Sequence, residues 1–85
     1  MKIDNNDLKY LEEKNLTWEK IEKRLGKLKI VPEMSCLHGY YDLKSGGSVF
    51  LYFDGEVCMM AQIITPKTEG KAITVDCTGT YQEYL

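Results

Sequence analysis

The sequence predicts an α+β fold in which two N-terminal helices pack on an antiparallel β-meander of four to five strands. Two helix-start signals occur within residues 4–26, whereas from residue 27 onward apolar and polar residues alternate with the period of strands. The run V-F-L-Y-F-D-G-E-V-C-M-M-A-Q-I-I, residues 49–64, places the turn pair Asp54-Gly55 between two apolar segments. Successive strands joined by short turns favour antiparallel pairing, and two helices are enough to cover one face of such a sheet.

The chain has 85 residues, which is the size of one small domain. We expect residues 1–85 to form that single domain, helical over 4–26 and β over 27–85. Removing the helices would expose the sheet, so no domain boundary is predicted between them.

The first helix is predicted over residues 5–14. Asp4 suits the N-cap position, because its carboxylate accepts hydrogen bonds from the unpaired N–H groups of the first turn. Ile3 and Leu8 have the spacing of a hydrophobic staple around that cap. Asn15 suits a left-handed residue at the end of the helix.

The second helix is predicted over Trp18–Leu25. Thr17 is its N-cap, and Leu16 and Ile21 repeat the staple spacing of the first helix. Gly26 suits the position just beyond the last turn.

The segment L-T-W-E-K-I-E-K-R-L-G, residues 16–26, resembles the first helix of a helix-turn-helix unit of DNA-binding proteins. The resemblance implies a recognition helix directly after it. However, Glu22 stands where such units usually have a small residue, and residues 27–32 alternate with period two and end in Pro32, which indicates a strand.

Nucleic-acid binding through the N-terminal helices is therefore the alternative function. Residues 1–30 hold eight Lys and Arg against six Asp and Glu, whereas residues 31–85 hold three against seven. Phosphate binding requires such basic side chains. The candidates are Lys9, Lys20, Lys23, Arg24, Lys27 and Lys29.

The remaining segments predict strands separated by turns. The expected strands are residues 28–30, 34–41 with a bulge at Gly39, 48–53, 56–64 and 71–77, with a turn at 45–47 and a loop at 65–70. Residues 80–85 are expected to form a short edge strand or a docked tail.

In the hairpin, a type I′ turn centred on Asp54-Gly55 would pair Leu51 with Cys58 and Tyr52 with Val57. Both faces of the ribbon would then be apolar, and the second face would need cover from loops, the tail or a partner. Tyrosine is common among interface anchors. The predicted partner-binding residues are Phe50, Tyr52, Val57, Met59, Tyr81 and Tyr84.

Four side chains have the chemistry of zinc ligands: Cys36, His38, Cys58 and Cys77. The C-x₂-C spacing of familiar structural sites is absent, and isolated thiols in strands usually pack as small apolar groups. No group is identified that would orient His38 as a base for a cysteine. We therefore predict no metal, no cofactor and no catalytic residues, and expect that the protein is not an enzyme.

The sequence also supports expectations about the cellular location of the protein and the type of partner it binds. The N-terminus is polar and acidic, no apolar run approaches a membrane span, and the three cysteines are odd in number, so a cytoplasmic protein without a membrane partner is expected. We expect a small protein-interaction module that binds a second copy of itself or another protein. An accessory or inhibitory protein of a phage or mobile element would suit this size.

Overall fold

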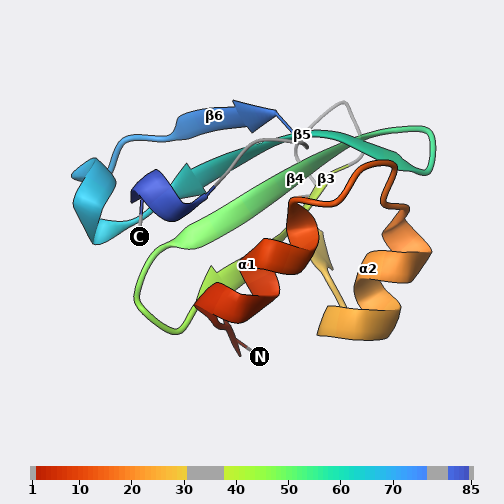
Figure 1. Ribbon diagram of the computed structural model, residues 1–85, viewed down its shortest axis with the longest axis horizontal. Helices are drawn as coiled ribbons and strands as arrows, with labels where there is room; N and C mark the ends of the chain where they lie inside the picture. The colour runs from red at the N-terminus through yellow and green to blue at the C-terminus, as the bar shows by residue number, and fades with distance from the viewer. Residues whose placement is uncertain (1, 31–37, 77–80, 85) are drawn as a thin grey trace.

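The computed structural model describes residues 2–30, 38–76 and 81–84, and within them two helices and a six-stranded sheet form two layers (Figure 1). The α+β class is confirmed. The elements are β1 (Lys2–Ile3), α1 (Asn5–Leu11), α2 (Trp18–Leu25), β2 (Lys29–Ile30), β3 (His38–Leu43), β4 (Ser48–Asp54), β5 (Val57–Ile64), the 3₁₀ turn η1 (Pro66–Thr68), β6 (Ile73–Asp76) and the 3₁₀ turn η2 (Gln82–Tyr84).

Helix α1 begins where the sequence predicts and ends three residues early. Asp4 and Asp7 cap it reciprocally, since the carboxylate of each accepts the backbone N–H of the other at 3.0 Å. The N–H of Glu12 already bonds to the carbonyl three residues back, which tightens the last turn and closes the helix at Leu11. Asn15 has the predicted left-handed conformation, with φ 59°, in the turn that follows.

Helix α2 has the predicted bounds. The hydroxyl of Thr17 accepts the N–H of Lys20 at 3.2 Å. At the other end, the N–H of Gly26 donates to the carbonyl of Glu22 at 2.9 Å, and Gly26 has φ 98°.

Strands β3, β4, β5 and β6 form the predicted antiparallel meander in chain order. The sheet is nevertheless mixed, because β1 adds to the far edge of β3 in parallel, with Ile3 opposite Leu43. The short strand β2 shares that edge and pairs with the beginning of β3. A parallel strand of two residues carries no periodicity, so no pattern in the sequence indicates β1.

Strand β3 passes through Gly39 without the predicted bulge. A Cβ atom at Gly39 would lie 2.9 Å from Cη2 of Trp18, so the glycine lets the indole pack directly on the strand. The strand continues to Leu43, two residues beyond the predicted end, and residues 34–37 of the predicted strand lie outside the described residues.

The β4–β5 hairpin has a different register from the predicted one. Its turn residues are Gly55 and Glu56, so Asp54 pairs with Val57. Gly55 has φ 62° whereas Glu56 has no positive φ, the pattern of a type II′ turn. The predicted pairs, Leu51 with Cys58 and Tyr52 with Val57, are wrong: Leu51 pairs with Ala61 and Tyr52 with Met60.

A register shift occurs beside Met59. At this point the edge of β5 that faces away from β4 changes its hydrogen-bonding partner. The N–H of Cys58 donates to the carbonyl of Leu16 at 2.8 Å, and the N–H of Trp18 donates to the carbonyl of Glu56 at 2.9 Å. Strand β6 takes over this edge only from Met60 onward. Met59 lies between these two partners as the extra residue of a bulge.

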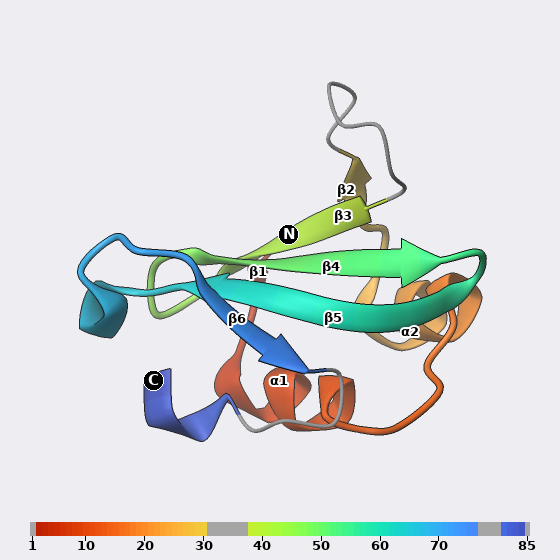
Figure 2. The same ribbon diagram turned by 90° about the horizontal axis from the view of Figure 1, so that it is seen from above.

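The core lies between the helices and one face of the sheet. Both helices and η2 lie on this side (Figure 2), and the C-terminal segment adds Tyr81 to the core. The most deeply buried side chains are Leu8, Ile21, Tyr41, Leu43, Val49, Leu51, Ala61, Ile63 and Tyr81. The segment 80–85 is thus a docked tail in its described part, rather than an edge strand.

Candidate functional site

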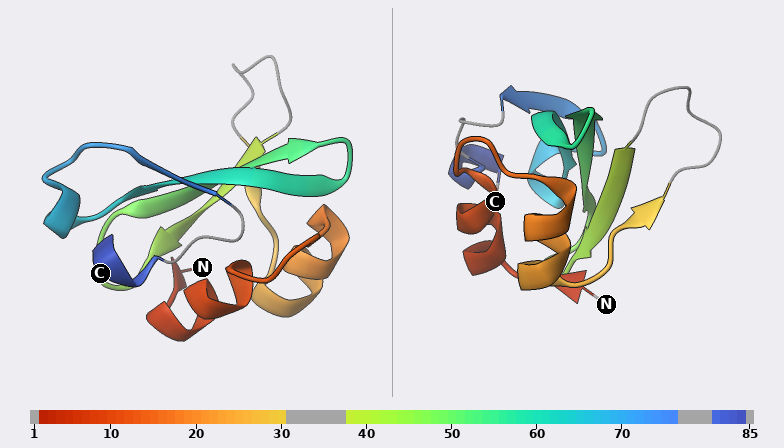
Figure 3. Two further views of the ribbon diagram at one scale, coloured as in Figure 1. Left: turned by 45° about the horizontal axis from the view of Figure 1, so that its top comes forward. Right: turned by 90° about the vertical axis from the view of Figure 1, so that its right-hand side faces the viewer.

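The face of the sheet opposite the helices, called the outer face here, is the candidate site (Figure 3). Paired residues of neighbouring strands share a face, so the register defines its composition. It consists of three cross-strand rows: Lys2, Asp42, Ser48 and Ile64; then Lys29, Tyr40, Phe50, Gln62 and Thr74; then His38, Tyr52, Met60 and, by its register position, Asp76.

Aromatic rings pack sideways across the middle of the outer face. The rings of His38 and Tyr52 stack with centroids 4.9 Å apart, and those of Tyr40 and Phe50 lie 5.3 Å apart. This lateral packing leaves Tyr40, Phe50 and Tyr52 only partly buried. No helix among the described residues lies over them, and cross-strand aromatic pairs of this kind stabilise the sheet itself.

Polar groups on the outer face are paired with one another. The hydroxyl of Tyr52 donates to Oε1 of Gln62 at 2.8 Å, and Nε2 of Gln62 donates to the hydroxyl of Thr74 at 3.5 Å. Nζ of Lys29 lies 2.7 Å from a carboxylate oxygen of Asp42. The face therefore presents an aromatic centre with polar groups whose hydrogen bonds are already made.

The ion pair at the edge shifts the pKa values of both partners. The hydrogen bond from Lys29 lowers the pKa of Asp42, with a smaller contribution in the same direction from the hydroxyl of Ser48, and it raises the pKa of Lys29. Because the pKa of Asp42 is lowered by folding, its stabilising effect is present above the pKa of the unfolded chain. That effect is lost as the pH falls through the folded value.

We expect Lys29→Met to raise the pKa of Asp42, since it removes the largest cause of the shift. The carboxyl carbon of Asp42, followed by NMR from pH 2 to pH 7, measures this directly. Lys27→Met removes an exposed lysine that makes no bond with Asp42, so it should leave the titration unchanged. An equal shift in both variants would contradict the assignment to Lys29.

The predicted partner-binding residues divide between the outer face and the core. Phe50 and Tyr52 lie in the outer face; Met59, in the bulge, is 53% exposed. Val57 opposes Asp54 beside the turn. The side chain of Tyr81 is 1% exposed and belongs to the core, so it presents almost no surface to a partner.

Tyr84 is partly buried and packs against the same core. The tail thus completes the inner layer, so it contributes no contact to the outer face. Tyr40, His38 and Met60 also belong to the outer face, although they are not among the predicted partner-binding residues. The alternation in residues 34–41 had placed Tyr40 and His38 on one side of a strand, but only the register of β3 against β4 shows which side that is.

The six basic candidates are dispersed. Lys20, Lys23 and Arg24 line a shallow hollow of about 350 Å³ with Tyr10, whose ring lies 4.6 Å below the guanidinium carbon of Arg24. Lys9 and Lys27 are exposed elsewhere. Lys29 belongs to the outer face and is paired with Asp42.

The candidate zinc ligands do not converge in the part that the structure describes. His38 lies opposite Tyr52 in the outer face, whereas Cys58 lies opposite Phe53 and is buried in the core on the other side of the sheet. These two side chains therefore cannot share a metal ion or act as a base and nucleophile. Cys36 and Cys77 lie outside the described residues.

The fold and the outer face define the class of this protein as a two-layer α+β domain with its helices on one side of the sheet. Compared with protein-family models, curated proteins and solved structures, the chain matches none. Among the helices of residues 2–30, 38–76 and 81–84, none is long and apolar enough to cross a membrane.

Proposed function

We propose that the protein is a protein-interaction module, and that its outer face packs against the outer face of a second copy. The observation that carries this proposal is the aromatic centre formed by Tyr40, Phe50 and Tyr52, over which no described helix lies. Tyrosine and phenylalanine in such a position are typical of the central, water-excluded part of protein interfaces.

The charges of the outer face permit a copy of the same chain as the partner. By register, its charged positions, with Asp54 at the end of β4, are two lysines and three aspartates. Lys29 and Asp42 already form an ion pair. A two-fold dimer brings each surface onto itself, and these charged positions lie around an uncharged aromatic centre, which limits like-charge repulsion between the copies.

The size of the face predicts a weak dimer. The six strands have between two and eight residues, and at about 3.3 Å per residue and about 4.8 Å between neighbouring strands they give a face of roughly 450 Å² per copy. Two such faces total about 900 Å², near the lower end of specific interfaces. We therefore expect a dissociation constant of about 1–100 μM, in a sheet-on-sheet dimer with its layers about 10 Å apart.

Light scattering coupled to size exclusion, at loading concentrations from about 5 μM to about 1 mM, tests the proposal across the expected range. We expect the mass to rise from monomer to dimer. Tyr52→Asp should weaken the dimer at least about tenfold, because it places an unpaired carboxylate in the apolar centre. Asn6→Asp is the matched control, since it adds the same charge at an exposed position on α1.

A chain that stays monomeric across this whole concentration range would refute self-association, and so would a dimer that Tyr52→Asp leaves intact while circular dichroism shows the native fold. Such a monomer would favour another protein as the occupant. A monomer would also favour an accessory or inhibitory protein of a phage or mobile element. Such a protein acts by occupying the surface of a partner.

Nucleic acid has less support as a partner. Of the six basic candidates, three line the hollow on α2, and Lys29 lies in the outer face with its charge balanced by Asp42. Phosphate binding along a strand of nucleic acid depends on a continuous basic surface.

A further inference from the structure

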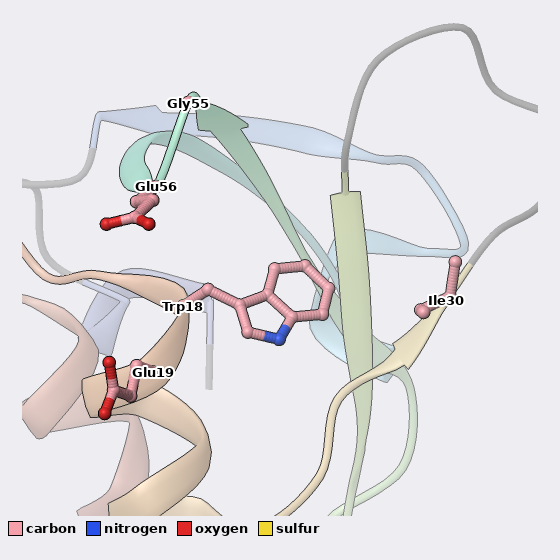
Figure 4. A pocket seen from close by; sticks show the side chains of 5 residues that line it. All are labelled: Trp18, Glu19, Ile30, Gly55 and Glu56. Atoms are coloured by element: carbon pink, nitrogen blue, oxygen red, sulfur yellow. The ribbon is translucent and has the colours of Figure 1, made fainter.

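A pocket of about 440 Å³ lies at the corner where α2, β2 and the β4–β5 turn meet. Its lining consists of Trp18, Glu19, Ile30, Gly55 and Glu56. Figure 4 shows the indole of Trp18 in the middle, with the carboxylates of Glu19 and Glu56 toward one side and Ile30 toward the other. The pocket is separate from the outer face, since Trp18 packs on the side of the sheet that carries the helices.

The indole is held in place by the fold. The backbone N–H of Trp18 donates to the carbonyl of Glu56 at 2.9 Å, which ties the start of α2 to the turn. The ring packs against Phe53 at a centroid distance of 4.9 Å and fits over Gly39, where no side chain intervenes. The aromatic surface therefore exists before any ligand arrives, which lowers the entropy cost of binding.

The pocket combines apolar walls with unbalanced negative charge. Ile30 is 58% exposed. Among the described residues, it and Met59 are the two large apolar side chains that are more than half exposed. Within the described part of the chain, the carboxylates of Glu19 and Glu56 make no ion pair, and no cationic side chain lines the pocket. An occupant complementary to all of these features is apolar along its length and positively charged at its end.

We infer that this pocket receives the side chain of an arginine residue from a protein partner. The guanidinium stacks on the face of Trp18, where the ring quadrupole attracts a cation, and its N–H groups donate to the carboxylates of Glu19 and Glu56. The methylene stem lies against Ile30. Arginine fits better than lysine, because a planar guanidinium stacks on an aromatic ring and can donate to two carboxylates at once.

The chain contains a single tryptophan, so its intrinsic fluorescence reports on the pocket directly. The probe is the blocked peptide acetyl-Gly-Arg-Gly-amide, titrated into about 0.1 μM protein, a concentration below the whole range of dissociation constants expected for the dimer. We expect a saturable change in the emission of Trp18 with a dissociation constant in the range of about 1–10 mM, as for a single side chain. The lysine peptide should bind several-fold more weakly, and the peptide of neutral citrulline should produce no saturable change.

Variants assign the effect to the pocket. The double variant Glu19→Gln with Glu56→Gln should weaken binding of the arginine peptide at least about fivefold, and Ile30→Ser about twofold. The double variant Glu13→Gln with Glu83→Gln removes the same charge at two exposed positions outside the pocket, so it should bind like the parent. None of the five substituted side chains is buried, so each variant is expected to keep the native fold.

Three results would overturn the inference: no saturable response to the arginine peptide, equal binding of the citrulline peptide, or equal weakening by the two double variants. Free arginine tests the source of the side chain. Free arginine carries an α-ammonium and an α-carboxylate where the blocked peptide has neutral amides, and a site for the side chain alone contacts neither group. Free arginine should therefore bind no more tightly than the blocked peptide; tighter binding would identify a small-molecule site and refute a protein partner. The titration uses dilute protein, so its outcome does not depend on whether the outer face forms a dimer.

Discussion

Tyr81→Ala is expected to lower the free energy of unfolding by about 3–5 kcal/mol, a large part of the stability of a small domain. Its side chain is 1% exposed, and its removal leaves a cavity in the hydrophobic core. Its backbone N–H also donates to a carboxylate oxygen of Glu12 at 2.9 Å. Urea unfolding followed by circular dichroism measures the loss.

The same experiment separates a core residue from a surface contact. Tyr84→Ala is the matched control, because Tyr84 is only partly buried, and we expect a cost of about 1–2 kcal/mol there. If Tyr81→Ala left the unfolding midpoint unchanged, the docked position of the tail would be refuted. The sequence-based prediction that Tyr81 contacts a partner would then regain support.

Gly47→Ala is expected to destabilise the protein by about 3–5 kcal/mol, since backbone strain and a steric clash add together. Gly47 has φ 91°, and a Cβ atom there would lie 1.9 Å from the carbonyl oxygen of Ile64. That oxygen belongs to the neighbouring strand β5, so the clash is relieved only by moving β4 away from β5.

Gly70→Ala is the control that isolates the strain. Gly70 has φ 80°, and a Cβ atom there would have no neighbour within 4 Å, so only the conformational cost of about 1–2 kcal/mol should remain. Thermal and urea unfolding of both variants measures the difference. Equal costs at the two positions would show that the close approach of Ile64 contributes nothing.

Sequence patterns predicted those elements that depend on residues close to them in the sequence. The N-caps Asp4 and Thr17 and the end of α2 at Gly26 depend on residues within one helical turn, and all three are confirmed. The meander from β3 to β6 follows from short connections, and it too is confirmed.

Features that depend on distant partners were not predictable in the same way. The bulge at Met59 exists because Leu16 and Trp18 occupy the first part of the β5 edge, and no pattern near Asp54-Gly55 indicates this. The extra residue pairs Met60 with Tyr52, whereas the turn at Gly55 and Glu56 pairs Val57 with Asp54 instead of Tyr52. The candidate site was therefore predicted as a pair of apolar faces, whereas its actual members are fixed by the register.

The pocket at Trp18 illustrates the same limit. Trp18 and Ile30 were assigned to a helix and a strand as ordinary apolar positions, and Glu56 to a strand beside a turn. The hydrogen bond between the N–H of Trp18 and the carbonyl of Glu56 joins two of these positions, and the pairing of Ile30 with Gly39, on which the indole packs, adds the third.

The docked tail also has a consequence for the time course of folding. The hydrogen bond between Tyr81 and Glu12 joins residues 69 positions apart, and a contact of such separation slows folding because a long loop must close first. During synthesis, the apolar side of α1 would stay uncovered until residue 81 had left the ribosome. Until then, the nascent polypeptide exposes this apolar surface to chaperones and proteases.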